Sequence, residues 1–148
     1  MQVIITTTAR QTQRVASLLA KKISASVSPR ARVVALKGNL GAGKTTFVQG
    51  FAKALGIIDI VQSPTFVLMK IYSLKREKQV RHLVHIDAYR IESLAEIKHI
   101  GLFRLLQDGD AIILIEWADR IKKMIPKDAK WITFEHGKKM HERILTIK

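Results

Sequence analysis

The chain has 148 residues, of which 47% are hydrophobic and 26% charged, a balance that predicts a globular domain and excludes a disordered chain. The chain has no cysteine, so we expect no disulfide. Its longest apolar runs, such as residues 111–115, are too short to cross a bilayer, and no signal-peptide pattern opens the sequence. We therefore expect a cytoplasmic protein. The net charge of +14 favours polyanions such as RNA or attraction of a nucleotide, although a solvated basic surface also accounts for it.

The N-terminal segment predicts a strand, a helix and a second strand. Residues 2–7 are rich in β-branched side chains, and Thr8 is a suitable N-cap for a helix that continues to about Ile23. Four side chains are expected on the buried face of this helix: Val15, Leu18, Leu19 and Ile23. After a loop that contains Pro29, residues 32–36 predict a short buried strand.

The segment that follows this strand matches the pattern G-x-x-x-x-G-K-[ST]. It consists of Gly38, Asn39, Leu40, Gly41, Ala42, Gly43, Lys44, Thr45 and Thr46. A helix is predicted next, from Thr45 to Leu55, and this strand–loop–helix setting distinguishes a phosphate-binding loop from a chance match. Backbone N–H groups of such a loop and the helix N-terminus bind phosphates. We therefore expect a nucleoside triphosphate site in which Lys44 reaches the β- and γ-phosphates and the Thr45 hydroxyl holds Mg²⁺.

The remaining elements predict a mixed sheet. Residues 67–72 and 83–86 are expected to form a hairpin around a charged turn at residues 74–79. Further along the chain we expect helices at residues 93–101, 103–107 and 119–125, an apolar strand at residues 111–115, and a terminal hairpin of residues 131–135 and 143–147. Because these elements follow one another without a linker or a repeat, the sequence predicts a single three-layer α/β domain over residues 1–148.

Two acidic residues follow buried strands downstream of the phosphate-binding loop. A nucleotide hydrolase needs an acid to anchor Mg²⁺, usually at the end of a strand beside that loop. We favour Glu116 as the Mg²⁺ ligand, directly or through water, because its strand is the most apolar and is therefore expected to be central. Asp87 is then expected to orient the attacking water or to contact the metal a second time, and a structural pairing with Arg90 is the alternative.

Three other features are compatible with a nucleotide site without being specific to it. Residues 63–65 form either a mobile loop that brings a hydroxyl to the γ-phosphate or an ordinary Ser-Pro turn. His85 alternates with apolar neighbours, as packed histidines do, and Trp117 either stacks on a base or fills the core. Since no guanine-reading N-K-x-D pattern follows the loop, ATP is favoured over GTP.

Four motifs occur together and in a fixed order. They are G-x-L-G-A-G-K-T-T at residues 38–46, V-x-S-P-T-F at 61–66, H-x-D-x-Y-R at 85–90 and I-E-W at 115–117. In this combination the chain resembles the TsaE family, bacterial ATPases needed for threonylcarbamoyladenosine modification of tRNA. The resemblance runs from the first predicted helix to the terminal hairpin.

The resemblance implies a P-loop NTPase fold and roles for individual residues. Thr45 and Glu116 resemble the Mg²⁺ ligands of the family and Asp87 its catalytic acid, while Thr65 belongs to a switch-like loop and Trp117 lines the nucleotide site. It also implies that the protein assembles with TsaD and TsaB, and that its ATP hydrolysis resets their complex between turnovers. Contact with tRNA is then indirect or weak, and neither DNA nor a membrane is an expected partner. Independently of the resemblance, no arginine finger is evident in the sequence; Arg90 is the candidate within the chain and a partner could supply this function instead, so we expect slow hydrolysis by the isolated protein.

Two other functions are compatible with the phosphate-binding loop. A small-molecule kinase would use Asp87 as the base toward an acceptor hydroxyl, but it usually needs a lid with several arginines, and residues 89–101 carry only Arg90 and Lys98 as cations. A nucleotide-gated RNA-binding module would depend on the basic surface more than on turnover. The charges are spread along the chain, and no aromatic RNA-binding motif accompanies them.

Overall fold

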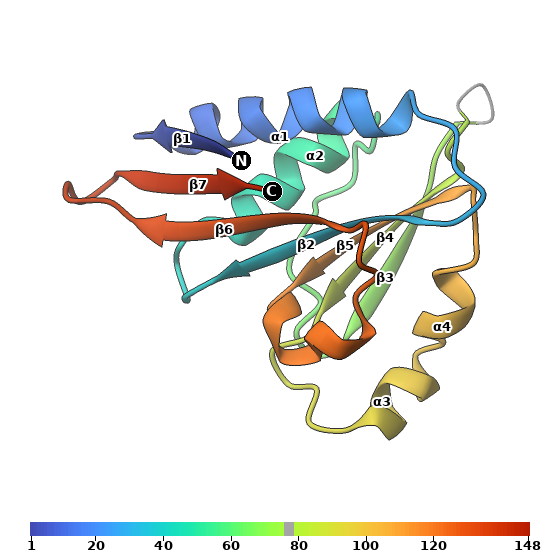
Figure 1. Ribbon diagram of the computed structural model, residues 1–148. Helices are drawn as coiled ribbons and strands as arrows, with labels where there is room; N and C mark the ends of the chain where they lie inside the picture. Colours follow the sequence, from blue (N-terminus) through green and yellow to red (C-terminus); the bar gives the residue numbers. More distant parts are fainter. Residues whose placement is uncertain (76–78) are drawn as a thin grey trace.

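Seven strands form one mixed sheet in the order β1-β7-β6-β2-β5-β4-β3 (Figure 1). The computed structural model describes residues 1–75 and 79–148. The strands are β1 (Gln2–Thr6), β2 (Arg32–Gly38), β3 (Met69–Ser73), β4 (His82–Asp87), β5 (Ala111–Glu116), β6 (Lys130–His136) and β7 (Arg143–Ile147). The predicted mixed sheet and the terminal β6–β7 hairpin are thereby confirmed.

The centre of the sheet is parallel and its edges are antiparallel. Strand β2 pairs in parallel with both β5 and β6, and β5 pairs in parallel with β4. Strand β3 closes one side as the predicted hairpin with β4, and β7 and β1 close the other. Because parallel strands end at the same edge, Asp87 at the end of β4 lies directly opposite Glu116 at the end of β5.

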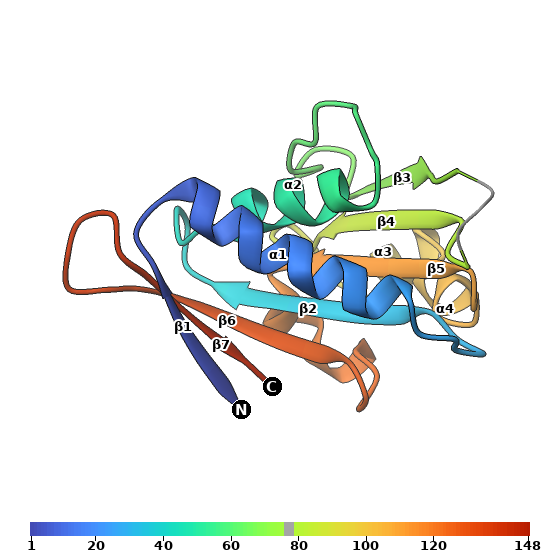
Figure 2. The same ribbon diagram turned by 90° about the horizontal axis from the view of Figure 1, so that it is seen from above.

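Helices cover both faces of this sheet, which confirms the predicted three layers. Helices α1 (Ala9–Ser24) and α2 (Lys44–Ala54) lie side by side on one face (Figures 1 and 2). The other face carries α3 (Leu94–His99), α4 (Leu102–Leu105) and the 3₁₀ helix η1 (Ala118–Met124). Among the described residues, no helix is both long enough and apolar enough to span a membrane.

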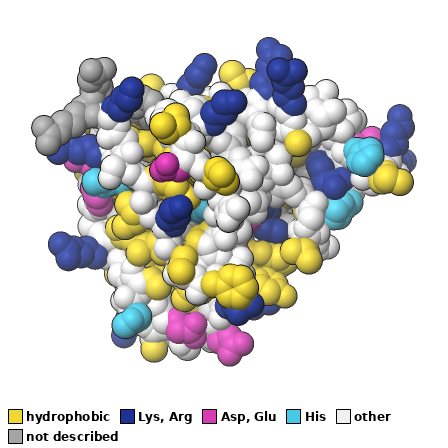
Figure 3. All heavy atoms as spheres, turned by 180° about the vertical axis from the view of Figure 1, so that it is seen from behind, with side chains coloured by type: hydrophobic (Ala, Val, Ile, Leu, Met, Phe, Trp, Pro, Cys, Tyr) yellow, Lys and Arg dark blue, Asp and Glu magenta, His cyan; other side chains and the backbone are white. Residues whose placement is uncertain are grey.

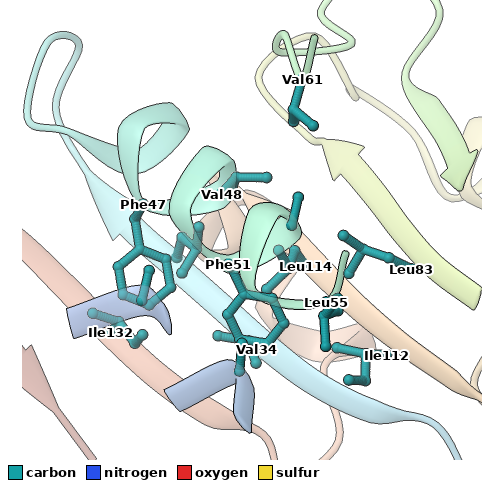
Figure 4. Packing of buried hydrophobic residues seen from close by; sticks show 14 of the residues in the cluster. Val34, Phe47, Val48, Phe51, Leu55, Val61, Leu83, Ile112, Leu114 and Ile132 are labelled. Atoms are coloured by element: carbon teal, nitrogen blue, oxygen red, sulfur yellow. The ribbon is translucent and has the colours of Figure 1, made fainter. Parts of the chain in front are cut away.

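The alternation of side chains along the central strands divides the core into two clusters. On the α2 side, Phe47 and Phe51 pack onto the sheet residues Val34, Leu114 and Ile132 (Figure 4). On the opposite side, a second cluster gathers every other residue of the same strands with the helices α3, α4 and η1; its sheet residues include Val33, Ala35, Ile113 and Ile115. Strands β2 and β5 are buried on both faces, which explains their nearly continuous apolar sequences.

The contact between α1 and α2 is unusually close. A Cβ atom at Gly50 of α2 would lie 2.5 Å from the Cα of Gln13 in α1. The buried face of α1 accordingly presents small side chains, Thr12, Ala16 and Ala20. Because small side chains face α2, the helix is rotated away from the orientation that its larger apolar residues predict. Val15, Leu19 and Ile23 are only partly buried. The prediction for Leu18 was wrong, since its side chain is 64% exposed.

Several predicted boundaries differ from the observed ones for local reasons. The strand predicted at residues 67–72 begins only at Met69, because Leu68 adopts a left-handed backbone conformation with φ 63°. The helix predicted at residues 119–125 is a 3₁₀ helix interrupted by non-helical dihedrals at Ile121. Of the charged turn predicted at residues 74–79, residues 76–78 lie outside the described residues.

The close α1–α2 contact predicts the effect of a single methyl group. We expect Gly50→Ala to lower the free energy of unfolding by about 2 kcal/mol through overpacking, although alanine alone favours a helix over glycine by about 1 kcal/mol. Urea denaturation would measure the change. Lys53→Ala, at an exposed position of the same helix, is the control and should stay within about 0.5 kcal/mol. A stabilised Gly50→Ala variant would show that the two helices separate freely.

Candidate nucleotide-binding site

The loop between β2 and α2 is built to bind an anion. Gly43 is the N-cap residue of α2 with a φ of 102°, a conformation that side chains with a Cβ rarely adopt. Within residues 1–75 and 79–148 no side chain caps this helix, and its first turn contains no acidic residue. The N–H groups at the helix start are therefore available to a phosphate, which the helix dipole also favours.

Lys44 places a buried ammonium group inside this loop. Its Nζ donates hydrogen bonds to the backbone carbonyls of Gly38 at 2.7 Å and Asn39 at 2.9 Å, and lies 4.0 Å from the ring centroid of Trp117. Burial lowers the pKa of Lys44 below its ordinary value, and the nearby carboxylates, first of all that of Glu116, oppose this shift. The ammonium is thus held next to the N-terminus of α2 by contacts on two sides.

Glu116 joins the phosphate-binding loop to the neighbouring strand. The Thr45 hydroxyl donates to its carboxylate, at 2.9 Å from Oε2 and 3.2 Å from Oε1. His85 of β4 lies 2.8 Å from Oε1 through its Nε2, and since a carboxylate only accepts, Nε2 carries the hydrogen. Nδ1 of this fully buried ring has no partner among the described residues. The orientation of Glu116 is therefore fixed from both sides.

Asp87 organises the loop at residues 63–65. The hydroxyls of Ser63 and Thr65 both donate to its Oδ2, Thr65 at 2.9 Å, while the backbone N–H of Tyr89 donates to Oδ1 at 2.9 Å. The alternative pairing of Asp87 with Arg90 does not occur, since among the described residues Arg90 stacks on Phe66, at 4.6 Å from the ring centroid, and forms no ion pair. Asp87 thus connects the loop to the end of β4.

These side chains surround one pocket of about 350 Å³ at the carboxyl ends of the central strands. It is lined by Leu40, Gly41, Gly43, Lys44, Thr45, Thr46, Ser63, Thr65, Asp87, Tyr89, Glu116 and Trp117. The residues that the sequence predicts for the site therefore lie together around this pocket, except for three residues of the phosphate-binding loop. Gly38 and Asn39 contribute carbonyls to Lys44, and Ala42 is buried in the core beneath the loop.

Trp117 adopts a strained conformation at this pocket. It has a φ of 57°, in the left-handed region that bulky residues avoid at a cost of about 1–2 kcal/mol. The turn directs its ring over Lys44 and against Tyr89, with 4.9 Å between the ring centroids. Strain of this kind persists where the surrounding structure holds it, commonly at functional sites.

A second pocket, of about 450 Å³, adjoins the first across the phosphate-binding loop. The two share Gly41, Gly43 and Thr46. The second is otherwise lined by the start of α1 and by the β6–β7 hairpin, including Thr8, Thr12, His141 and Arg143. From the sequence, the start of the first helix near Thr8 and the terminal hairpin were the segments suggested for contact with the base, and both line this pocket. Neither His141 nor Arg143 was singled out, because their place beside the loop depends on how the hairpin packs across the sheet.

Comparison with known proteins identifies the family. The family described as "Threonylcarbamoyl adenosine biosynthesis protein TsaE" matches residues 6–145, nearly the whole chain and all the site residues above. The chain belongs to the TsaE family. This confirms the resemblance inferred from the four motifs.

Individual TsaE proteins are similar over most of this chain. The protein from Bacillus subtilis is 39% identical over 116 residues, which are 78% of this chain and 69% of that protein. The protein from Borreliella burgdorferi is 38% identical over 100 residues, 68% of this chain and 69% of that protein. Both carry the name tRNA threonylcarbamoyladenosine biosynthesis protein TsaE.

A solved structure has the same fold. The crystal structure of Bacillus subtilis YdiB superposes with a TM-score of 0.72 at 32% identity, covering 99% of this chain and 83% of that one. The predicted P-loop NTPase fold is therefore confirmed, and membership of a family of P-loop ATPases supports an ATPase activity.

The contact of His85 with Glu116 is a further feature of this TsaE-family site that the sequence did not predict. The polar ring of His85 on an otherwise apolar strand was the available signal, but its partner on β5 depends on strand pairing. We expect His85→Ala to lower the free energy of unfolding by about 3 kcal/mol, because it leaves a cavity and removes a partner from the buried carboxylate of Glu116.

Thermal or urea unfolding would measure this loss. The matched control is His82→Ala on the same strand, whose ring is partly exposed and lies 3.6 Å from Asp108; a change within about 0.5 kcal/mol is expected there. Equal effects at both positions would contradict a specific role for the His85–Glu116 contact.

Proposed function

We propose that this protein is the ATP-binding and ATP-hydrolysing subunit of the machinery for threonylcarbamoyladenosine modification of tRNA. The observation that carries the proposal is the hydrogen bond of Thr45 to Glu116 beside the phosphate-binding loop, in a chain that carries all four motifs of the TsaE family. Residues 1–148 form a single ATPase domain in this proposal. Because the pathway acts on tRNA, its proposed location is the cytoplasm.

The proposed position of ATP follows from the two pockets. The β- and γ-phosphates bind the N–H groups at the start of α2 and the ammonium of Lys44. The base occupies the second pocket, between Thr8 and Arg143, which continues directly from the phosphate-binding loop. Trp117 lies in the first pocket, and its proposed role is to pack over Lys44 and enclose the phosphates.

The oxygen groups of Thr45 and Glu116 fit Mg²⁺. This ion prefers oxygen ligands and usually combines one or two protein groups with waters and substrate phosphates. The hydroxyl of Thr45 and the carboxylate of Glu116 already lie within hydrogen-bonding distance of each other and provide two such protein groups. Among the described residues there is no cluster of three or more Asp, Glu, His or Cys side chains that could hold a metal ion. Bound Mg²⁺ would neutralise the charge that develops on the β- and γ-phosphate oxygens.

Hydrolysis requires a water molecule in line with the bond that breaks. In the proposed mechanism, the Asp87 carboxylate accepts a hydrogen bond from this water and orients it toward the γ-phosphorus. The water oxygen forms the new bond as the bond from the γ-phosphorus to the bridging oxygen breaks, giving ADP and phosphate. Thr65, whose hydroxyl donates to Asp87, lies where it can exchange this partner for a phosphate oxygen.

The proposed activity of the isolated protein is slow. Arginine side chains that stabilise the transition state accelerate related enzymes by about 10³–10⁵-fold, and no arginine is among the described residues that line the phosphate pocket. Arg90 stacks on the exposed ring of Phe66 instead. We propose that association with TsaD and TsaB completes the site, and that hydrolysis then resets their complex between turnovers.

Two substitutions should separate binding from turnover. Lys44→Ala removes the cation that faces the β- and γ-phosphates and should weaken ATP binding at least tenfold. Glu116→Ala should retain most of the binding and abolish Mg²⁺-dependent hydrolysis. Calorimetric titration with a non-hydrolysable ATP analogue and a phosphate-release assay would measure the two effects. Hydrolysis at the parent rate by the Glu116 variant would show that the metal assignment is wrong.

The function itself is tested by hydrolysis in the presence of the proposed partners. We expect the protein to bind TsaD and TsaB in a nucleotide-dependent manner, and its hydrolysis rate to rise at least tenfold in their presence. The Lys44→Ala variant is the control for nucleotide dependence. Absence of association, with phosphate transferred from ATP to a metabolite, would instead support a small-molecule kinase.

A further inference from the structure

The first 58 residues carry most of the net positive charge of this protein, because they contain no acidic residue. The first acidic residue of the chain is Asp59, whereas the 58 residues before it contain nine Lys and Arg residues. Helices α1 and α2 both lie within this segment, and neither contains an acidic residue. The layer that these helices form on one face of the sheet therefore has no negative side chain to balance its cations.

Four of these cations line a groove along α1 and α2. The groove has a volume of about 760 Å³, and Arg10, Arg14 and Lys21 of α1 face Lys53 of α2 across it. All four side chains are exposed, and none forms an ion pair with any residue in the described ranges. In Figure 3, Lys and Arg side chains stand along the upper edge of the molecule, the level at which α1 lies in Figure 1, and others are scattered over the rest of that face.

The remaining lining of the groove is polar. Thr8, Gln11, Gln13 and Ser17 contribute hydroxyl and amide groups, and Gly50 and Ala54 are the only apolar residues among the described ones that line it. A protein interface of ordinary stability needs an apolar centre, commonly with aromatic anchors. Phosphate groups, by contrast, are bound by Arg and Lys together with Ser, Thr and Gln side chains.

We propose that the groove between α1 and α2 binds the phosphodiester backbone of RNA. The choice of RNA among polyanions rests on the proposed function in tRNA modification; the recognition of phosphates rests on the groove itself. Since no aromatic side chain lines the groove within the described part of the chain, bases have no surface there on which to stack, and binding is independent of sequence.

The groove lies outside the phosphate pocket. The two have no lining residue in common, but the groove shares Thr8 with the second pocket at the start of α1. RNA bound along the groove therefore leaves the phosphate pocket at the carboxyl ends of the central strands open, and the groove meets the proposed base pocket only at Thr8.

Fluorescence anisotropy with a labelled RNA hairpin tests the proposal. Four phosphate contacts predict that affinity falls about 100-fold between 50 and 200 mM salt. The double substitution Arg14→Gln with Lys53→Gln should weaken binding at least tenfold at 100 mM salt, and should reduce the slope of log K against log salt concentration by about 2.

The matched control is Lys122→Gln with Lys123→Gln, which removes the same charge from η1 on the opposite face of the sheet. Its affinity should stay within threefold of the parent protein. Equal losses in the two double variants would overturn the proposal in favour of diffuse attraction by net charge, and no binding by the parent protein at 50 mM salt would overturn it outright.

ATP hydrolysis and association with TsaD and TsaB, measured on the same variants, separate this proposal from the proposed function. The groove variant should hydrolyse ATP and bind these proteins like the parent. If it keeps RNA binding and loses TsaD and TsaB instead, the groove is a protein-docking surface and the RNA proposal is wrong. A third outcome is that neither the parent protein nor any variant binds TsaD and TsaB, while RNA binding still depends on the groove residues. In that case the proposed function fails and the groove proposal stands.

Discussion

The buried carboxylate of Glu116 is the contact on which the site depends. It ends the central strand β5, accepts a hydrogen bond from Thr45 at the start of α2, and contacts His85 on β4. Three elements distant in the sequence are thereby held together at one point. A buried charge is tolerated only with such partners, because desolvation otherwise costs more than folding gains. The same carboxylate helps to keep a positive charge on Lys44 beside the phosphate-binding loop.

Much of the site was predictable because its signals are local. The phosphate-binding loop is one continuous segment, and the run of apolar residues before Glu116 indicated a central strand. The sequence also indicated that Asp87 and Glu116 both end buried strands. That they lie directly opposite each other follows from the parallel β4–β5 pairing, which the sequence did not specify.

The features that were not predictable depend on the packing of distant segments. Apolar periodicity placed Leu18 inside, but the close approach of Gly50 to α1 favours small residues at the contact, and Leu18 lies outside. The left-handed conformation of Trp117 has no sequence signal, since glycine would be expected there. The pairing of β1 with β7 joins strands more than a hundred residues apart and cannot be inferred from either one.

The contact at Gly50 has a mechanical consequence. Where two backbones approach this closely with no side chain between them, no rotamer change can take up a shift of one helix against the other. The start of α2 in the phosphate-binding loop and the basic outer side of α1 therefore belong to one tightly packed unit.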